Sequence, residues 1–280
     1  MRCYHLPDEQ LYADYLFGKQ TIQQLSVSYH LSARQIQRRL NGTIDSLSYI
    51  RPKPHTVAIQ MDATYWGKNN GLLVIKDVYS GKVLWRKFLV KKETIADYLE
   101  GVANLKTQGY TIIGAVADGL RGLQQALGQL LGKIPFQYCQ FHAIHFVRLQ
   151  LTTRPQTQPG QQLLAIANGM THTDLESFEG ALTEWFEHWS SYINERTTSD
   201  NGHTFYTHRR LRMAAMSLKR NMDVLWTFYT YSELKLPNTN NAMESFFAGL
   251  KKLIGVHNGL SVQHKKAMID AYIIGYNADK

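Results

Sequence analysis

The segment VAIQMDATYW, from Val57 to Trp66, predicts a buried β-strand with a carboxylate in its middle. Apolar side chains at Val57, Ile59 and Met61 follow the two-residue repeat of a strand, and Asp62 comes directly after them. A buried carboxylate is costly unless a cation, a hydrogen-bond network or a proton compensates its charge. Asp62 therefore indicates a functional site. The alternative is a device that protects a strand edge or fixes its register.

The composition is that of a basic protein with a sizeable core. The 280 residues allow two or more domains, and 44% of them are hydrophobic. Lys and Arg number 31 against 22 Asp and Glu, which gives a formal charge of +9 and a pI near 9.4. This excess of positive charge favours an anionic partner, and DNA or RNA is the partner that it suits best.

Several features of the sequence indicate a cytoplasmic protein, associated with the nucleoid if it binds DNA. Cys3 and Cys139 are its two cysteines, so no disulfide framework is expected. The N-terminus lacks the basic-then-apolar pattern of a signal peptide, and no apolar run reaches the length of a membrane span. We therefore expect no membrane partner.

Residues 1–50 predict a helix-turn-helix DNA-binding domain. Ser32 and Gln35 have the spacing of a capping box, which starts a second short helix after a turn. His30 occupies the turn position where glycine is usual, but histidine tolerates a positive φ better than most residues. The second helix carries side chains that suit phosphates and base edges, and these candidate DNA-binding residues are Arg34, Gln35, Arg38 and Arg39. A plain helical hairpin is the alternative.

A proline-containing linker at 51–56 separates these helices from a region rich in strand patterns. Three strand-like runs at 57–66, 72–79 and 82–90 are joined by short turns and predict an antiparallel meander. A helix is predicted at 94–107. A strand, a helix, and a strand that passes into a helix follow at 110–119, 120–132 and 135–142. The order β-β-β-α-β-α-β-α predicts an α/β fold with a mixed sheet, the ribonuclease-H-like core, whose first part spans 57–155.

A long segment without strand patterns interrupts this core. Residues 156–236 predict an all-helical insertion, in which the basic stretch 208–220 forms either a solvated helix face or a track for a phosphate backbone. Residues 237–280 return to the core with a helix that carries Glu244. Because Asn241 and Glu244 have capping-box spacing, a structural role is the alternative for this acid.

Three acids occupy positions that this fold would bring together. Asp62 lies on the first strand, Asp118 at the end of the fourth strand and Glu244 on the late helix, whereas Asp77 is expected to be structural. The ribonuclease-H-like order places the first and fourth strands side by side, so the three carboxylates should converge. Convergent carboxylates repel one another unless divalent cations neutralise them, and Mg²⁺ prefers oxygen ligands. Two such ions can activate a water and stabilise the leaving oxygen of a phosphodiester.

Four motifs give the chain a resemblance to a known family. QMDATYWG, VADGLRGL, YCQFH and NTNNAMESFFAGLKKLIGVHNGLS resemble those of bacterial insertion-sequence DDE transposases related to mutator-like elements. The resemblance implies a catalytic and metal-binding triad of Asp62, Asp118 and Glu244, with Mg²⁺ or Mn²⁺ as cofactor. The 126-residue spacing between the second and third acids accommodates a helical insertion. The implied partners are the element's terminal repeats and target DNA, bound by a homo-oligomer.

The resemblance also covers a Cys-x-x-His motif at Cys139 and His142. Two ligands do not make a structural zinc site, so Cys139 is interpreted as a small buried side chain. His142 is implied as a catalytic residue that contacts metal, scissile phosphate or a neighbouring catalytic group, and a core histidine is the alternative. Relatives often carry a cysteine-rich zinc ribbon before the helix-turn-helix, whereas this chain has Cys3 alone in that region.

Three functions remain open at this point. The first is a transposase that frees a 3′-hydroxyl at the element's ends and directs it against target DNA. The second is a ribonuclease-H-like nuclease or resolvase that only cuts, and the predicted insertion favours transposition over it. The third is an inactive, transposase-derived DNA-binding protein. The acidic residues at all three triad positions argue against such decay.

Overall fold

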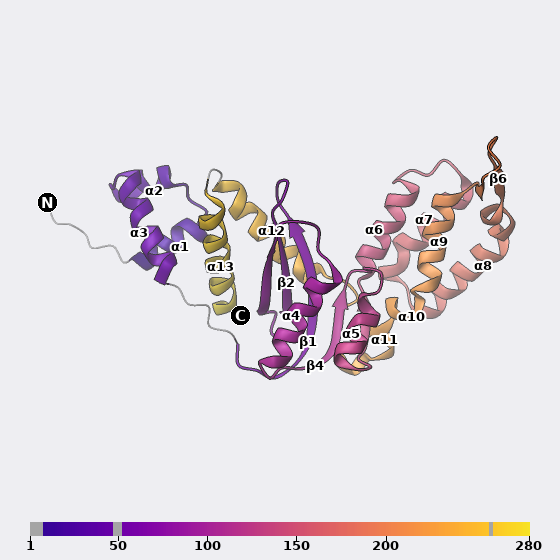
Figure 1. Cartoon of the computed structure of the whole chain (residues 1–280), viewed down its shortest axis with the longest axis horizontal. Coiled ribbons are helices and arrows are strands. Elements are labelled where there is room, and N and C mark those ends of the chain that lie inside the picture. The colour runs from indigo at the N-terminus through magenta and orange to yellow at the C-terminus, as the bar shows by residue number, and fades with distance from the viewer. Residues whose placement is uncertain (1–7, 47–51, 258–259) are drawn as a thin grey trace. The chain divides into compact units, whose positions relative to one another are not determined.

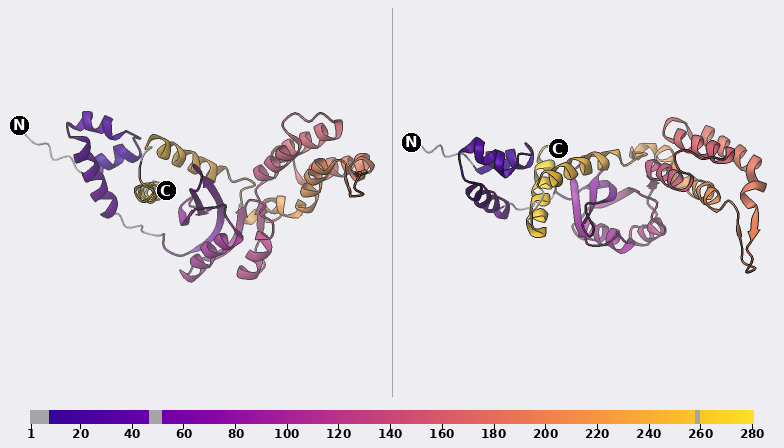
Figure 2. Two further views of the ribbon diagram at one scale, coloured as in Figure 1. Left: turned by 45° about the horizontal axis from the view of Figure 1, so that its top comes forward. Right: turned by 90° about the horizontal axis from the view of Figure 1, so that it is seen from above.

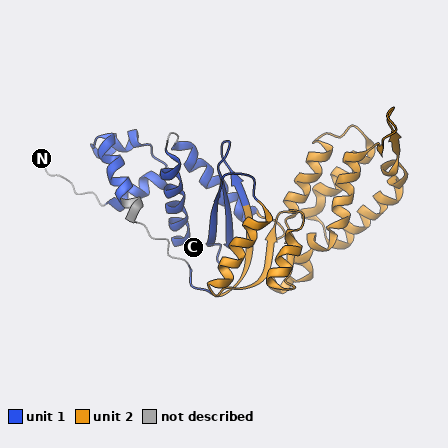
Figure 3. Cartoon of the chain, viewed as in Figure 1, with its two compact units in different colours: residues 1–54, 63–93, 241–280 blue, residues 55–62, 94–240 orange. Residues whose placement is uncertain are grey.

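The computed structural model describes residues 8–46, 52–257 and 260–280 (Figure 1). The chain folds as two compact units, which Figure 3 shows in different colours. Unit 1 comprises residues 1–54, 63–93 and 241–280. Unit 2 comprises residues 55–62 and 94–240. No helix in the described ranges is long and apolar enough to cross a membrane.

One five-stranded sheet has the order β3-β2-β1-β4-β5. The strands are β1 (Thr56–Tyr65), β2 (Gly71–Asp77), β3 (Val83–Leu89), β4 (Thr111–Ala117) and β5 (Phe136–Tyr138). β4 runs parallel to β1 and to β5, whereas β2 and β3 are antiparallel, so the sheet is mixed. This is the ribonuclease-H-like arrangement. The prediction that the first and fourth strands are neighbours is confirmed.

The register between β1 and β4 sets the frame for the candidate site. Ile59 pairs with Ala115 and Gln60 with Val116. The apolar side chains of β1 and β4 are almost all buried, as expected for parallel strands in the middle of a sheet. The helix α4 (Ile95–Thr107) lies between β3 and β4 in the sequence and α5 (Leu123–Leu131) between β4 and β5, close to their predicted positions.

Unit 1 contains an apolar core that joins distant parts of the sequence. Its N-terminal helices are α1 (Asp8–Leu16), α2 (Ile22–Tyr29) and α3 (Ala33–Ser46), and its C-terminal helices are α12 (Asn241–Val256) and α13 (Val262–Ala278). Leu25 and Ile36 belong to the same buried cluster as Phe246, Leu250 and Met268. The N-terminal helices thus share one apolar core with the helix that carries Glu244.

The turn between α2 and α3 has the predicted conformation. His30 adopts φ 52° and ψ 37°, the left-handed conformation that glycine usually supplies. The Ser32 hydroxyl accepts a hydrogen bond from the Gln35 backbone N–H at 3.3 Å, and the Gln35 side chain accepts one from the Ser32 N–H at 2.9 Å. The predicted capping box is therefore confirmed. Asp77 accepts hydrogen bonds from Tyr79 and Ser80 in the turn after β2, which confirms its structural role.

Helices make up most of unit 2 after β5. They are α6 (Gln140–Leu151), α7 (Gln158–Gly169), α8 (Leu175–Asn194), α9 (Arg209–Arg220), α10 (Met222–Leu225) and α11 (Thr227–Thr230), with short 3₁₀ turns at Met170–His172 and Ser232–Leu234. The basic stretch lies on α9, as predicted. α6 packs against α9, and α7 packs against α8.

The prediction that the insertion contains no strand is wrong. β6 (Arg196–Thr198) and β7 (Thr204–Tyr206) form an antiparallel hairpin that projects from the helices of unit 2 (Figures 1 and 2). Threonine and aromatic side chains favour these strands, and Gly202 supplies the positive φ of 78° that the turn requires. The Asn201-Gly202 dipeptide between two such runs is a hairpin pattern that the sequence analysis passed over.

Lys76 on β2 provides a pH-dependent test of the fold. Its side chain is 1% exposed, and its ammonium donates hydrogen bonds to the Ala242 carbonyl at 3.1 Å and the Tyr276 hydroxyl at 3.0 Å. Burial, with a contribution from Lys280, lowers the pKa of Lys76 from 10.5 to about 8. The folded state therefore releases this proton at a lower pH than the unfolded chain does.

We expect this difference in pKa to stabilise the fold as pH rises. Between about pH 8 and 10.5 the unfolded chain holds the Lys76 proton and the folded chain does not, so the free energy of unfolding gains about 2 kcal/mol after allowance for screening. Urea unfolding of the wild type and Lys76→Met across this range would measure the gain. Because tyrosines also titrate at high pH, the difference between the two proteins is the informative quantity, and equal pH dependence would contradict the assignment.

Candidate active site

Asp62 is buried on the central strand of the sheet. Its side chain lies on β1 and is 6% exposed. Asn240, itself 1% exposed, donates a side-chain hydrogen bond to the carbonyl of Met61, the residue before Asp62. The strand around the carboxylate is thus held by its pairing in the sheet and by the hydrogen bond from the Asn240 amide to the Met61 carbonyl, which is 3.4 Å long. A carboxylate in such a place needs compensation of its charge, as the sequence analysis argued.

His142 lies in the first turn of α6, directly after β5. Cys139 connects the two elements, and its backbone N–H donates to the Ala117 carbonyl at 2.8 Å. Gln140 donates its backbone N–H to Asn238 at 2.9 Å and its side-chain amide to Leu225 at 3.1 Å. Because these bonds fix the junction between β5 and α6, the backbone at the start of α6, which carries His142, has little freedom.

Cys139 is a buried free thiol, as interpreted from the sequence. Its Sγ accepts the backbone N–H of Asn240 at 3.2 Å. Asn240 is the residue before α12, so the sulfur helps to fix the point at which this helix begins. In the Cys-x-x-His motif, Cys139 thus has a structural role and His142 faces the candidate site.

Glu244 lies in the first turn of α12, which begins at Asn241. Asn240, the residue before the helix, is bound to the carbonyl of Met61, and Lys76 binds the carbonyl of Ala242 within the first turn. Met243, Phe246 and Phe247 bury the apolar face of the helix in unit 1, while Glu244 itself is exposed. The Glu244 carboxylate is therefore attached to a helix end whose backbone is fixed, but the carboxylate itself lies outside the apolar core.

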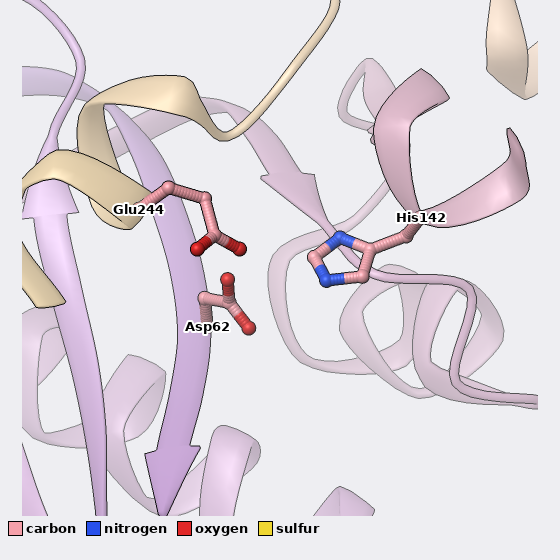
Figure 4. Close-up of side chains that lie close together, drawn as sticks. All are labelled: Asp62, His142 and Glu244. Carbon is pink, nitrogen blue, oxygen red and sulfur yellow. The ribbon is translucent and has the colours of Figure 1, made fainter. Parts of the chain in front are cut away.

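Asp62, His142 and Glu244 form a group of potential metal ligands (Figure 4). One ligand atom from each residue lies within 4.8 Å of the others. Figure 4 shows the two carboxylates pointing toward each other and the imidazole directed at them. Two carboxylates and one imidazole fit a divalent cation, because carboxylate oxygens suit Mg²⁺ and Mn²⁺ and imidazole suits the transition metals.

Asp118 lies on the loop that follows β4 and is half-buried. Its carboxylate accepts the backbone N–H of Leu120 at 3.2 Å. It is not one of the three grouped ligands in the described part of the chain, where His142 takes the third place. The register of β1 and β4 ends at the pair of Gln60 and Val116, and Asp62 and Asp118 each follow two residues later. The role of Asp118 as a metal ligand stays a prediction.

Several buried polar residues that support this site were not predicted from the sequence. Four side chains, each at most 1% exposed, donate hydrogen bonds to backbone carbonyls around the acids and the histidine. They are Lys76, Asn240, Gln137 and Gln140. Lys76, Gln137 and Gln140 each interrupt an apolar run of the sequence, whereas Asn240 lies in a polar stretch. A polar residue inside an apolar run is the pattern that would have identified the first three.

The predicted DNA-binding residues lie on α3. Arg34, Gln35 and Arg38 are exposed, whereas Arg39 is partly buried and forms an ion pair with Asp8 at 2.5 Å. Arg34 and Arg38 are four residues apart, so they occupy one face of the helix. Gln35 takes part in the capping box, which leaves its amide less available for a base edge.

We expect Arg38→Ala to weaken DNA binding more than Arg39→Ala does, since Arg39 already has a carboxylate partner. Each lost phosphate contact should also lower the salt slope of binding by about one. Fluorescence anisotropy with labelled duplex DNA from 50 to 300 mM salt would measure both quantities. Equal affinities and slopes for the wild type and Arg38→Ala would show that this helix does not bind phosphates.

Comparisons with known proteins returned structural likenesses but no sequence family. No protein-family model and no curated protein matches the chain. The catalytic core domain of BIV integrase is 18% identical and aligns over 60% of this chain and 99% of its own, with a TM-score of 0.24. An integrase-containing structure, the simian T-cell lymphotropic virus intasome in complex with PP2A regulatory subunit B56 gamma, is 14% identical over 74% of this chain and 68% of its own, with a TM-score of 0.25.

A Mos1 transposase paired-end complex with the left transposon end is 15% identical. It aligns over 81% of this chain and 80% of its own, with a TM-score of 0.21. All three scores are low, so the assignment of the ribonuclease-H-like fold depends on the strand order and pairing of this chain itself.

Proposed function

We propose that the chain is a DDE-type DNA transposase of an insertion sequence, a metal-dependent polynucleotidyl transferase. One observation carries this proposal. On a ribonuclease-H-like sheet, two acids and a histidine from distant parts of the sequence present ligand atoms within 4.8 Å of one another. Asp118, two residues after the Val116 that pairs with Gln60, completes the proposed set of acids.

The chemistry of the residues fits phosphodiester cleavage. A divalent cation bound by Asp62, Glu244 and Asp118 would supply Lewis-acid activation of a water and charge stabilisation of the leaving oxygen. The buried position of Asp62 keeps its carboxylate in a low-dielectric place, where its interaction with a cation is strong. His142 is close enough to these carboxylates to orient the scissile phosphate or to hold a proton during cleavage.

Two further features support transposition over cleavage alone. The inserted helices and hairpin of residues 156–236 add a large surface that a simple nuclease does not need, and α9 carries a basic stretch. The N-terminal helices present exposed arginines for DNA. In the proposed reaction, the chain acts as a homo-oligomer on the element's ends, frees a 3′-hydroxyl by hydrolysis and joins it to target DNA.

A strand-transfer assay tests this function. Purified chain, labelled DNA that carries the element's ends and supercoiled target plasmid would be incubated with Mg²⁺ or Mn²⁺. Joined products that carry the label support a transposase. Cleaved ends without joined products would identify a nuclease, and DNA binding without cleavage would identify an inactive DNA-binding protein. Asp223→Asn, an exposed acid on α10, serves as the control for loss of one carboxylate.

A further inference from the structure

A cavity of about 390 Å³ opens beside Asp118 within unit 2. The loop after β4, the strand β5, helix α6 and the end of α9 all contribute to its lining. Its volume suits one small organic ligand or one nucleotide and is too small for a base pair. The metal-ligand group of Asp62, His142 and Glu244 does not line it, so the cavity is a separate feature of the site region.

Aromatic rings form a substantial part of the wall. Phe136 and Tyr138 come from β5 and are almost fully buried, and Phe146 comes from α6. Gly119 permits this arrangement, because a Cβ atom there would lie 2.3 Å from the ring of Tyr138. Burial, with a contribution from Asp118, raises the pKa of Tyr138, so its hydroxyl stays neutral. The loop after β4 therefore packs closely against the Tyr138 ring at Gly119, and the cavity lies beside this contact.

Two arginines bring positive charge to the same cavity. Arg121 lies on the loop before α5, and Arg220 is the last residue of α9. Both are exposed, and neither takes part in an ion pair within the described residues. A guanidinium binds phosphate oxygens through paired N–H groups, and aromatic rings stack on bases of any sequence. Phosphate-binding and base-binding groups are thus present side by side.

We infer that this cavity binds one unpaired nucleotide of the DNA strand at the active site. This inference rests on the proposed function, since it places the nucleotide next to Asp118. The base lies against Phe146 and Tyr138, and the phosphates face Arg121 and Arg220. Such a pocket holds a strand by a base that has left the duplex stack and thereby positions the neighbouring phosphodiester for cleavage.

The test uses the full chain with single-stranded DNA in EDTA, where no cleavage occurs. The probe is a fluorescein-labelled 30-nucleotide strand of mixed sequence that contains one 5-iodo-deoxyuridine. Irradiation links this base to an aromatic ring that stacks on it, and mass spectrometry identifies the linked residue. We expect links to Tyr138 or Phe146. Links confined to peptides that do not line the cavity would overturn the inference.

Matched variants separate the cavity from general basic charge. Arg121→Ala and Arg220→Ala should each lower affinity for the strand by roughly tenfold, and Phe146→Leu by roughly fivefold. The controls Lys133→Ala and Arg154→Ala remove exposed cations of the same unit outside the cavity and should change affinity less than twofold. Equal losses in both sets would overturn the inference.

Failure of the pocket and failure of the proposed function give different results. A chain that joins labelled ends in the strand-transfer assay but forms no link in the cavity is a transposase without this pocket. A chain that forms the link but neither cuts nor joins DNA in Mg²⁺ has the pocket without the proposed activity.

Discussion

Asp62→Asn will bind DNA like the wild type and cut it about a thousandfold more slowly. The substitution keeps the shape of the side chain and removes the charge that the proposed cation needs, and loss of several kcal/mol of transition-state stabilisation gives a change of this size. Glu244→Gln should show the same loss. We expect Asp118→Asn to do so too if this residue, in the loop directly after β4, holds metal.

The same variants provide a readout that does not depend on cleavage. A ligand that binds the folded state raises the melting temperature, and at a given concentration a tighter ligand raises it more. Mn²⁺ should therefore raise the Tm of the wild type and leave that of Asp62→Asn and Glu244→Gln unchanged. The Asp223→Asn control should respond to Mn²⁺ as the wild type does. A normal Mn²⁺ response of Asp62→Asn, with cleavage intact, would remove this residue from the metal site.

The adjacency of β1 and β4 could be predicted because it depends on element order, which the hydrophobic pattern sets. Short turns join the first three strands, and helices separate the next two, so few topologies remain. The turn chemistry of Asp77 and the capping box of Ser32 were also predictable, since each depends on residues only two or three positions away. Local physics thus accounts for the parts of the fold that the sequence predicted well.

The ligand group was harder to predict because it depends on where side chains point. Sequence order places Asp118 and His142 at the ends of adjacent strands, β4 and β5, and both are therefore candidates for the same region. Which of them lies within 4.8 Å of Asp62 and Glu244 is decided by the loop after β4 and by the bonds that hold the start of α6. Those bonds involve Leu225 and Asn238, which are distant in sequence.

The shared core of the N-terminal and C-terminal helices could not be predicted from the sequence. Each helix has an apolar stripe, and such a stripe does not specify its partner. The structure shows that Leu25 and Ile36 belong to one cluster with Phe246 and Leu250. Consequently the proposed DNA-binding helices and the helix of Glu244 belong to one compact unit.

His142→Asn will fold normally and bind DNA, but will cut it roughly a hundredfold to ten-thousandfold more slowly, the range for loss of a group that moves a proton or orients a phosphate. The backbone bonds around Cys139 and Gln140 do not involve the imidazole, so the junction between β5 and α6 should persist. His145→Asn is the matched control, because His145 is exposed one turn further along the same helix.

Two measurements identify what the imidazole does. Circular dichroism of both variants checks the fold, and cleavage rates at saturating Mg²⁺ give the loss. An Mn²⁺ titration followed by Tm then separates a ligand from a phosphate-orienting group, because only loss of a ligand weakens the metal response. A slow variant with a normal Mn²⁺ response places His142 on the phosphate. A folded variant that cuts at the wild-type rate returns His142 to a packing role, and Asp118 then becomes the stronger candidate for the third ligand beside Asp62 and Glu244.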